Sequence, residues 1–401
     1  MQKIKKNTPW MISCVLLTLI SSLNIVIRLA ADKSITRSII AVLMGTMFVI
    51  GISFLKEEYL YDFSLILYSS VLILLFLPLL LETSYSNRYL VIGSFAFLTS
   101  AAVPLSFMQI SKVITRYRAV TTERLIAICF LSALPTFVLL LQNNHAYMIL
   151  SLMVIFVTAI ILKRENRIKI PWRVFIMLAI LAMICLVAIY SDGGYIRQKV
   201  DVIFTRGMCD PYGVGWVRTV CDKLFKSAKI VGSSSYMVGK ASIIETLYDF
   251  ANCDIAIIIA KYGWLAFIGT LALYAGFFVC LFKMILKTKQ SSFARYTSLI
   301  SGLYLLCQTI YSLIGLFLLE RAPMNPPFID GFTCIITNFA LFGIISMLYL
   351  RRNEPSEVKE YACNNRKSII YQLREKLNLL LGLSDDFEDN YYDDDFEDDE
   401  F

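Results

Sequence analysis

The sequence is poor in the residues that build most soluble active sites. It has a single histidine, His145, which excludes any metal centre that depends on a histidine cluster. It contains no phosphate-binding loop, no dinucleotide-binding fingerprint and no HExxH zinc motif. Charged residues make up only 17% of the chain, whereas 57% are hydrophobic. Because a soluble domain could not hide that much apolar surface, the composition predicts an integral membrane protein.

Ten apolar segments have about the length, roughly 20 residues, that a helix needs to cross a hydrocarbon core about 30 Å thick. Backbone polar groups in lipid must pair internally, so these segments are predicted to be helices. The predicted spans are 9–31, 36–55, 62–82, 90–113, 123–141, 146–163, 171–190, 252–286, 296–320 and 328–350. The fourth is the weakest, because its first half, Tyr89 to Thr99, also fits a re-entrant or interfacial piece.

Basic residues flank alternate connections, so all of them fall on one side if every span crosses once. They are Lys3, Lys5 and Lys6; Lys112, Arg116, Arg118 and Arg124; Lys163, Arg164, Arg167, Lys169 and Arg173; Lys283, Lys287, Lys289 and Arg295; and Arg351 and Arg352. By the positive-inside rule that side is the cytoplasm, so both termini are predicted to be cytoplasmic. The fold class is thus all-α, a polytopic membrane protein with about ten transmembrane helices and one large extracellular loop at 191–250. Since the basic runs sit at membrane ends, they argue against nucleic-acid binding.

Two further regions differ from the transmembrane domain predicted for residues 1–353. Residues 354–383 carry apolar residues at helical spacing and are predicted to form a cytoplasmic amphipathic segment. Residues 384–401 are almost all acidic and are predicted to be disordered, either as a solubilising tail or as a docking segment for a basic partner. Spacing alone leaves open whether Cys209 and Cys221, which share the large loop, form a disulfide.

The candidates for chemistry are charged residues on the predicted outer face. They are Arg88, Arg206, Asp210, Glu245, Asp249, Asp254, Arg321 and Asp330. Asp254 fits best, because it opens the apolar run Ile255 to Ala260 and an ionisable residue at membrane depth is costly. The equal alternative is a helix N-terminal carboxylate stabilised by the backbone dipole. In the large loop, Pro211, Gly213 and Gly215 indicate a tight turn before an amphipathic helix at 218–230.

Four stretches together resemble the SEDS family of membrane proteins for shape, elongation, division and sporulation. Asn87-Arg88-Tyr89-Leu90-Val91-Ile92-Gly93 with Phe95-Ala96-Phe97 is similar to the family's "KRW-x-x-IG" and "F-x-FQPSE", and Asp210-Pro211-Tyr212-Gly213-Val214-Gly215-Trp216 to its "DPxGxGYQ". Ala260-Lys261-Tyr262-Gly263-Trp264 resembles the middle of its eighth span, and Pro327-Phe328-Ile329-Asp330-Gly331 with Asn338 resembles "PFISYGG…N". Their shared order covers nearly the whole chain up to Asn353.

The resemblance implies a glycosyltransferase of the bacterial cytoplasmic membrane, typified by FtsW, RodA and SpoVE. Such proteins polymerise lipid II at the outer face, usually beside a class B penicillin-binding protein, in division, elongation or sporulation. The implied catalytic residue is Asp254. The alternative is position 252, where a gapless match to the family places Asn252. The substrate-binding candidates are Arg88, Arg206, Asp210, Trp216, Arg321 and Asp330. Basic residues or a divalent cation would offset the pyrophosphate charge of the substrate.

The sequence departs from the family at several acidic positions. Leu98-Thr99-Ser100-Ala101 replaces "QPSE", and Asn144 replaces the aspartate of "QPDLGT". Val217 stands where the loop motif has glutamine. One alternative is therefore a degenerate scaffold that binds a penicillin-binding protein or a lipid-linked sugar. The other is an unrelated lipid-linked polysaccharide polymerase or ligase, while a transporter is disfavoured because internal repeats are not apparent.

Overall fold

The computed structural model describes residues 7–81, 89–92, 95–115, 122–142, 144–165, 216–234, 237–238, 241–247, 254–288, 291–318, 325–329 and 331–353. The long helices are α2 (Thr8–Ala30), α3 (Thr36–Ser53), α4 (Glu57–Leu81), α6 (Thr122–Leu141), α7 (His145–Arg164), α13 (Trp264–Lys287), α14 (Ser292–Leu318) and α15 (Phe332–Leu350). Seven of them, all but α6, are long and apolar enough to cross a membrane. The protein is therefore a helical polytopic membrane protein, as predicted. The predicted span 171–190, the first part of the large loop and the residues after Asn353 lie outside the described residues.

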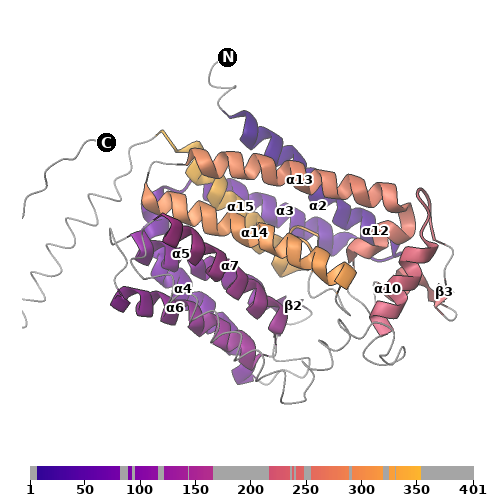
Figure 1. The fold of residues 1–401 in the computed structure, drawn as a ribbon, viewed down its shortest axis with the longest axis horizontal. Helices are drawn as coiled ribbons and strands as arrows, with labels where there is room; N and C mark the ends of the chain where they lie inside the picture. Colours follow the sequence, from indigo (N-terminus) through magenta and orange to yellow (C-terminus); the bar gives the residue numbers. More distant parts are fainter. Residues whose placement is uncertain are drawn as a thin grey trace, which may run out of the picture. The chain divides into compact units, whose positions relative to one another are not determined.

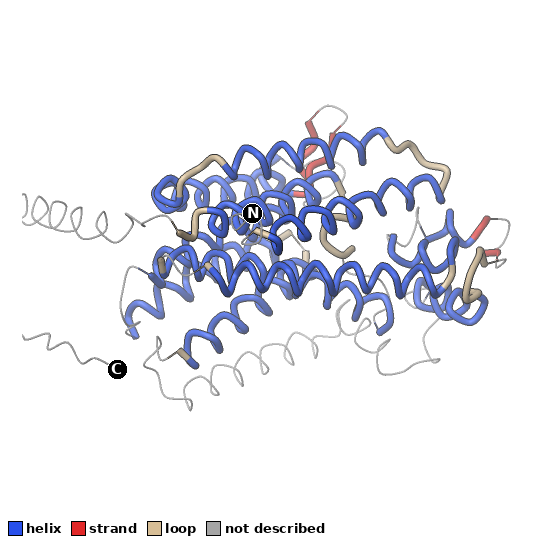
Figure 2. The backbone as a smooth tube through the Cα atoms, turned by 90° about the horizontal axis from the view of Figure 1, so that it is seen from above, coloured by secondary structure: helices blue, strands red, loops and turns tan. Residues whose placement is uncertain are grey.

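The core lies around α14 and α15, which are the most buried of the long helices. Figure 1 shows both in the middle of the bundle, and Figure 2 shows the helices running side by side. Helix α15 packs against α3 and α14, whereas α13 packs against α2. Helix α5 (Val103–Thr115) fits between α4 and α14. Outward-facing positions of α2, α3 and α4 are rich in exposed leucine, isoleucine and phenylalanine. Since lipid tails are as apolar as these side chains, this exposed apolar surface is suited to lipid contact.

Two glycines allow α3 and α15 to approach closely. A Cβ atom on Gly45 of α3 would lie 2.6 Å from Cγ of Phe339, inside its van der Waals contact. On the other helix, a Cβ atom on Gly343 would lie 3.1 Å from Cα of Val49. Small residues at helix interfaces are the usual means of tight packing in membranes, where burial between helices gains little from the hydrophobic effect.

The predicted span 90–113 is wrong as a single helix. Strands β1 (Tyr89–Ile92) and β2 (Phe95–Leu98) form an antiparallel hairpin, with Tyr89 opposite Leu98, before the 3₁₀ turn η1 (Thr99–Ala102). The strand residues are mostly β-branched or aromatic, and two small residues separate them, which favours a hairpin over a helix. The remaining α5 has 13 residues and a length of about 20 Å, too short for the assigned span. The re-entrant alternative weighed for its first half agrees better with the structure.

The predicted span 252–286 is also not one helix. It consists of α12 (Asp254–Tyr262) and α13, which are separated at Gly263. Gly263 has φ of 89° and ψ of −179°, a backbone conformation that is essentially restricted to glycine. The sequence shows an apolar run on both sides of this glycine, so its composition alone did not reveal the break.

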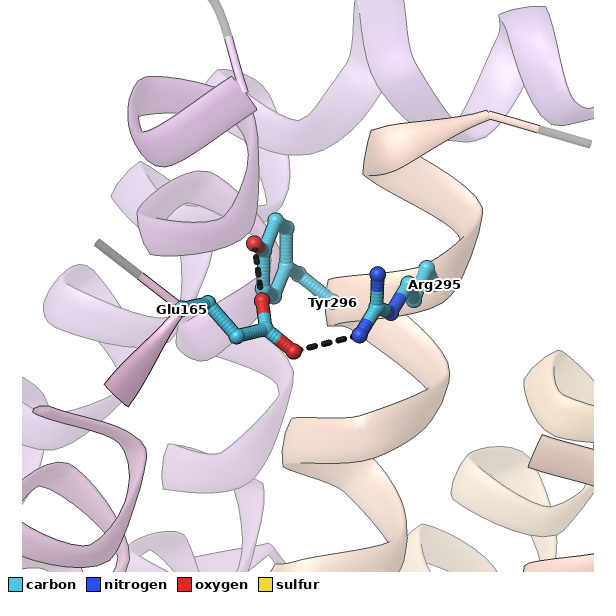
Figure 3. A network of polar contacts seen from close by, with 3 residues as sticks. All are labelled: Glu165, Arg295 and Tyr296. Atoms are coloured by element: carbon cyan, nitrogen blue, oxygen red, sulfur yellow. Dashed lines mark hydrogen bonds and ion pairs between the residues drawn. The ribbon is translucent and has the colours of Figure 1, made fainter. Parts of the chain in front are cut away.

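One end of the bundle, here called the basic end, joins the helices through polar contacts. Glu165, just after α7, pairs with Arg295 of α14 and accepts a hydrogen bond of 2.7 Å from the hydroxyl of Tyr296 (Figure 3). At the same end, Ser291 donates to the carboxylate of Glu57, and Arg351 donates to the carbonyl of Phe54. The described members of the predicted basic runs lie at or near helix ends; they are Lys112, Arg124, Lys163, Arg164, Lys283, Lys287, Arg295, Arg351 and Arg352. Their orientation in a membrane remains a prediction.

Candidate functional site

Asp254, the best candidate in the sequence, is the first residue of α12 and exposes only 9% of its surface. The six residues that follow it, Ile255 to Ala260, are all buried. The carboxylate therefore lies among apolar side chains, where its polar atoms require specific partners.

The side-chain amide of Asn325 supplies such partners through both its nitrogen and its oxygen. Its Nδ2 donates to Oδ2 of Asp254 at 3.0 Å, and its Oδ1 accepts from the backbone N–H of Asp254 at 3.2 Å. Asn325 is itself buried. The paired contact satisfies one of the open N–H groups at the start of α12 and fixes the plane of the carboxylate. Both readings of Asp254 thus have a basis here, since it starts a helix and is also held by a dedicated partner.

Gln308 of α14 supports Asn325 from the other side. Its Nε2 donates to the backbone carbonyl of Asn325 at 3.2 Å. Its Oε1 is buried and has no hydrogen-bond partner among the described residues. The site therefore contains a buried acceptor beside the Asp254–Asn325 pair, which is unusual because buried polar atoms are normally paired.

Helix α12 turns back along α13, so Asp254 lies well below the end of the bundle that carries Gly263, here called the loop end. With 9 residues at a rise of 1.5 Å, α12 is about 13 Å long. A contact of α13 agrees with this position of Asp254. The hydroxyl of Tyr274, ten residues after Trp264, donates to the carbonyl of Pro327 at 2.5 Å, and Pro327 is two residues after Asn325, the partner of Asp254. Figure 1 shows α12 beside the loop end of α13. Asp254 is thus at the inner tip of a re-entrant helix.

The break at Gly263 is covered by the segment that follows α10 (Trp216–Ser227). Lys229 and Ile230 accept backbone hydrogen bonds from Trp264 and Leu265, at 3.1 and 3.0 Å. In return, Gly232 and Ser234 donate to the carbonyls of Tyr262 and Ala260, at 3.1 and 2.7 Å. These four bonds satisfy backbone groups that the interrupted helix leaves open.

Helix α10 confirms the helix predicted within the large loop, with bounds 216–227 rather than 218–230. Its Phe225 ring lies 5.6 Å from Trp264 and 5.3 Å from Phe317 of α14. Arg218 pairs with Asp222 at 3.1 Å and also donates to the carbonyl of Phe317. Trp216, a predicted substrate contact, is half-buried and packs on the core. These contacts give Trp216 a structural role, while a substrate contact remains a prediction.

One position at which the chain departs from the family motifs, Asn144, contacts the residue next to another, Ala101. Nδ2 of Asn144, in place of an aspartate, donates to Oγ of Ser100 at 2.7 Å. Gln142 donates to the carbonyl of Leu75 at 2.6 Å and to Oγ1 of Thr99 at 3.3 Å. All four polar side chains are buried. A neutral hydrogen-bonded junction therefore includes position 144, where the resemblance implies an aspartate, and lies next to Ala101, where it implies a glutamate.

The other sequence candidates lie outside the described residues. These are Arg88, Arg206, Asp210, Asp249, Asn252, Arg321 and Asp330, together with Cys209. Their predicted roles, and a Cys209–Cys221 disulfide, stay predictions. Glu245 lies in the short helix α11 (Ile243–Thr246), close along the chain to the buried Leu247.

Asn325 and Gln308 were missed in the sequence. Asn325 lies in the proline-rich segment between Arg321 and Asp330, which was noted only for its charges. Gln308 stands near the middle of a predicted span, and a polar residue at that depth is a signal of a functional contact. Neither could be joined to Asp254 without knowing that α12 folds back.

Comparison with known proteins identifies the fold. No protein-family model matches the sequence, and no curated protein sequence matches it. One matching solved structure is described as "Structural coordination of polymerization and crosslinking by a peptidoglycan synthase complex". It has a TM-score of 0.70 and 19% identity, over 86% of this chain and 98% of the other.

The Rod shape determining protein RodA of Thermus thermophilus also matches. Its TM-score is 0.58 at 17% identity, over 85% of this chain and 96% of that chain. An aspartate-to-alanine variant of the same RodA gives 0.59 at 17%, over 85% and 97%. At such identities the likeness concerns the fold alone. The chain therefore has a SEDS-like fold, shared with RodA, as the order of its motifs predicted.

Proposed function

We propose that this protein is a SEDS-type peptidoglycan glycosyltransferase that polymerises lipid II at the outer face of the bacterial cytoplasmic membrane. The single observation that carries the proposal is the buried Asp254, held by Asn325 at the tip of a re-entrant helix. An acidic side chain at such depth is costly and is therefore a functional candidate. The RodA-like fold supports the choice of reaction class.

In this reaction Asp254 would act as general base. It would take the proton from an acceptor sugar hydroxyl while that oxygen forms a bond to the anomeric carbon of the donor. The bond between that carbon and the lipid pyrophosphate breaks, and the pyrophosphate leaves with the electron pair. Asn325 would keep the carboxylate in one orientation, which limits the reorganisation needed for proton transfer. Arg88, Arg206, Arg321, Asp210, Trp216 and Asp330 remain proposed substrate contacts.

The described residues do not form a site for a divalent cation. Among them, no group of three or more His, Cys, Asp or Glu side chains is placed to hold a metal ion. At the candidate site they supply one carboxylate, while Oδ1 of Asn325 already accepts a backbone hydrogen bond. Hard divalent cations take six or more oxygen ligands. No step of the proposed reaction is therefore assigned to a metal.

The proposed partner is a class B penicillin-binding protein. One structure with the same fold is described as a peptidoglycan synthase complex that coordinates polymerisation and crosslinking. A chain that supplies polymerisation would need such a crosslinking partner beside it. We further propose that both termini are cytoplasmic, because the basic end collects the residues that the positive-inside rule places there.

A second candidate function is a non-catalytic scaffold with the same partner or a lipid-linked sugar. The neutral junction of Asn144 with Ser100 favours it, because Asn144 stands in place of an aspartate and Ala101, next to Ser100, in place of a glutamate. A different lipid-linked polysaccharide polymerase or ligase is disfavoured by the RodA-like fold.

The test is polymerisation of lipid II by the purified protein, alone and with its class B synthase. Glycan chains formed in either condition support the enzyme, and their absence in both supports the scaffold. An Asn252→Asp variant separates the two further, because it restores an acidic residue at the position given by the gapless match. Activity gained only by that variant would mean that the native site is degenerate.

A further inference from the structure

Two large apolar side chains are exposed where the segment after α10 crosses the broken helix. Ile230 exposes 76% and Val231 65% of its surface. They lie in the covering segment 228–234, whose backbone bonds to Tyr262 and Leu265 on either side of Gly263. Their exposure is unusual in a connecting segment, because grouped apolar side chains on a surface generally mark a contact site.

These side chains continue the lipid-facing stripe of α13. The large apolar residues exposed on that helix are Leu265, Ile268, Val279 and Leu286, of which Leu265 exposes 59% of its surface. Leu265 donates its backbone N–H to the carbonyl of Ile230, so these two residues with exposed apolar side chains are hydrogen-bonded neighbours. Exposed apolar side chains next to lipid-facing residues are expected to contact lipid as well.

Lysines border the same surface. Lys223 and Lys226 lie three residues apart on the exposed face of α10, Lys229 follows the helix, and Lys261 is exposed on the last turn of α12. Asp222, the acidic residue of α10, already pairs with Arg218. Beside them, Tyr262 is partly exposed. Apolar side chains flanked by tyrosine and lysine are typical of protein segments that lie at the boundary between acyl chains and headgroups.

We infer that the covering segment is a membrane anchor, in which Ile230 and Val231 enter the acyl region and Lys223, Lys226, Lys229 and Lys261 bind anionic phospholipid headgroups. Each lysine near an anionic membrane surface strengthens the affinity for that surface about fivefold. The occupant is lipid rather than a protein helix, because the patch combines continuity with the lipid-facing stripe and a border of positive charge.

The anchor also bears on the candidate site. The covering segment bonds to Ala260 and Tyr262 at one end of α12, and Asp254 lies at the other. Anionic lipid that binds the covering segment would therefore also stabilise the position of α12. This consequence rests on the proposed function, whereas the anchor itself does not.

Hydrogen–deuterium exchange of the full-length protein in lipid nanodiscs tests the anchor. In nanodiscs of phosphatidylglycerol and phosphatidylcholine, peptides covering 228–234 and 262–266 should exchange roughly tenfold more slowly than in phosphatidylcholine alone, since several lysines act together. The variant Lys223→Gln, Lys226→Gln, Lys229→Gln should lose this difference. The matched control Lys56→Gln, Lys283→Gln, Lys287→Gln removes the same charge at the basic end and should keep it. Equal exchange in both lipids, or equal effects of the two variants, would overturn the anchor.

A photo-crosslinking amino acid at Val231 supplies an independent measurement that needs no lysine change. Irradiation in the same nanodiscs should give protein–lipid adducts, detected by mass. Adducts only with an added class B penicillin-binding protein, and none with lipid, would show a protein docking surface instead. Both measurements are made without substrate, so failure of lipid II polymerisation would not alter their outcome.

Discussion

Replacement of Gly263 by alanine should release the segment that covers the broken helix. The new Cβ would lie 2.7 Å from the carbonyl oxygens of both Lys229 and Ile230. It would also have to adopt a conformation with φ of 89° that costs about 1–3 kcal/mol outside glycine. The two oxygens accept the hydrogen bonds from Trp264 and Leu265, which contribute roughly 1 kcal/mol each. The local cost is therefore about 2–5 kcal/mol, from both terms.

The assay is hydrogen–deuterium exchange of peptides covering 229–234 and 262–266. A loss of about 2 kcal/mol in local opening free energy raises exchange roughly 30-fold, since each 1.4 kcal/mol is about tenfold. Gly269→Ala is the matched control, because a Cβ there meets nothing within 4 Å and alanine favours a helix. Unchanged exchange in Gly263→Ala, or the same increase in both variants, would refute the stated role of the glycine.

Three further predictions follow from other contacts. Asn325→Ala should lower the local stability of the start of α12 by about 1–3 kcal/mol, because it leaves the buried carboxylate and N–H of Asp254 without these bonds, and exchange at 254–262 measures it. Gly45→Ala should lower the thermal unfolding temperature by overpacking the α3–α15 interface, at a cost of about 1–3 kcal/mol; no change in that temperature would contradict the close approach. In intact cells, a Ser233→Cys variant, at an exposed polar residue of the covering segment, should react with an impermeant thiol reagent, because we propose that the loop end faces outward; labelling no greater than that of wild type would contradict this orientation.

Much of the fold could be predicted because a membrane imposes a length on apolar helices. Helices α2, α3, α6 and α7 begin and end close to the predicted bounds. The two errors arise where the same apolar composition serves another structure. Residues 89–92 and 95–98 continue an apolar run but are mostly β-branched or aromatic, and they pair as a hairpin. At Gly263 a single glycine inside an apolar run reverses the chain, and only its φ reveals this.

The acidic residue of the candidate site could be predicted from the sequence, but the residues that hydrogen-bond to it could not. Asp254 was visible as a charged residue that opens an apolar run. Its bonds to Asn325 depend on how α12 folds back, which brings together residues 71 positions apart. The acidic residues lost at positions 101 and 144 could each be noted in the sequence. The hydrogen bond from Asn144 to Ser100, which brings position 144 next to position 101, needed the fold.

Lipid II polymerisation by an Asp254→Asn variant tests the central claim most directly. Removal of a general acid or base typically costs about 10²–10⁴ in rate, so the variant should lose glycan synthesis by that order while its membrane abundance stays that of the wild type. Asp62→Asn is the matched control, because it makes the same change at an exposed residue of α4 near the basic end and should leave the rate unchanged. Wild-type polymerisation that persists in Asp254→Asn would contradict the proposed role of this carboxylate.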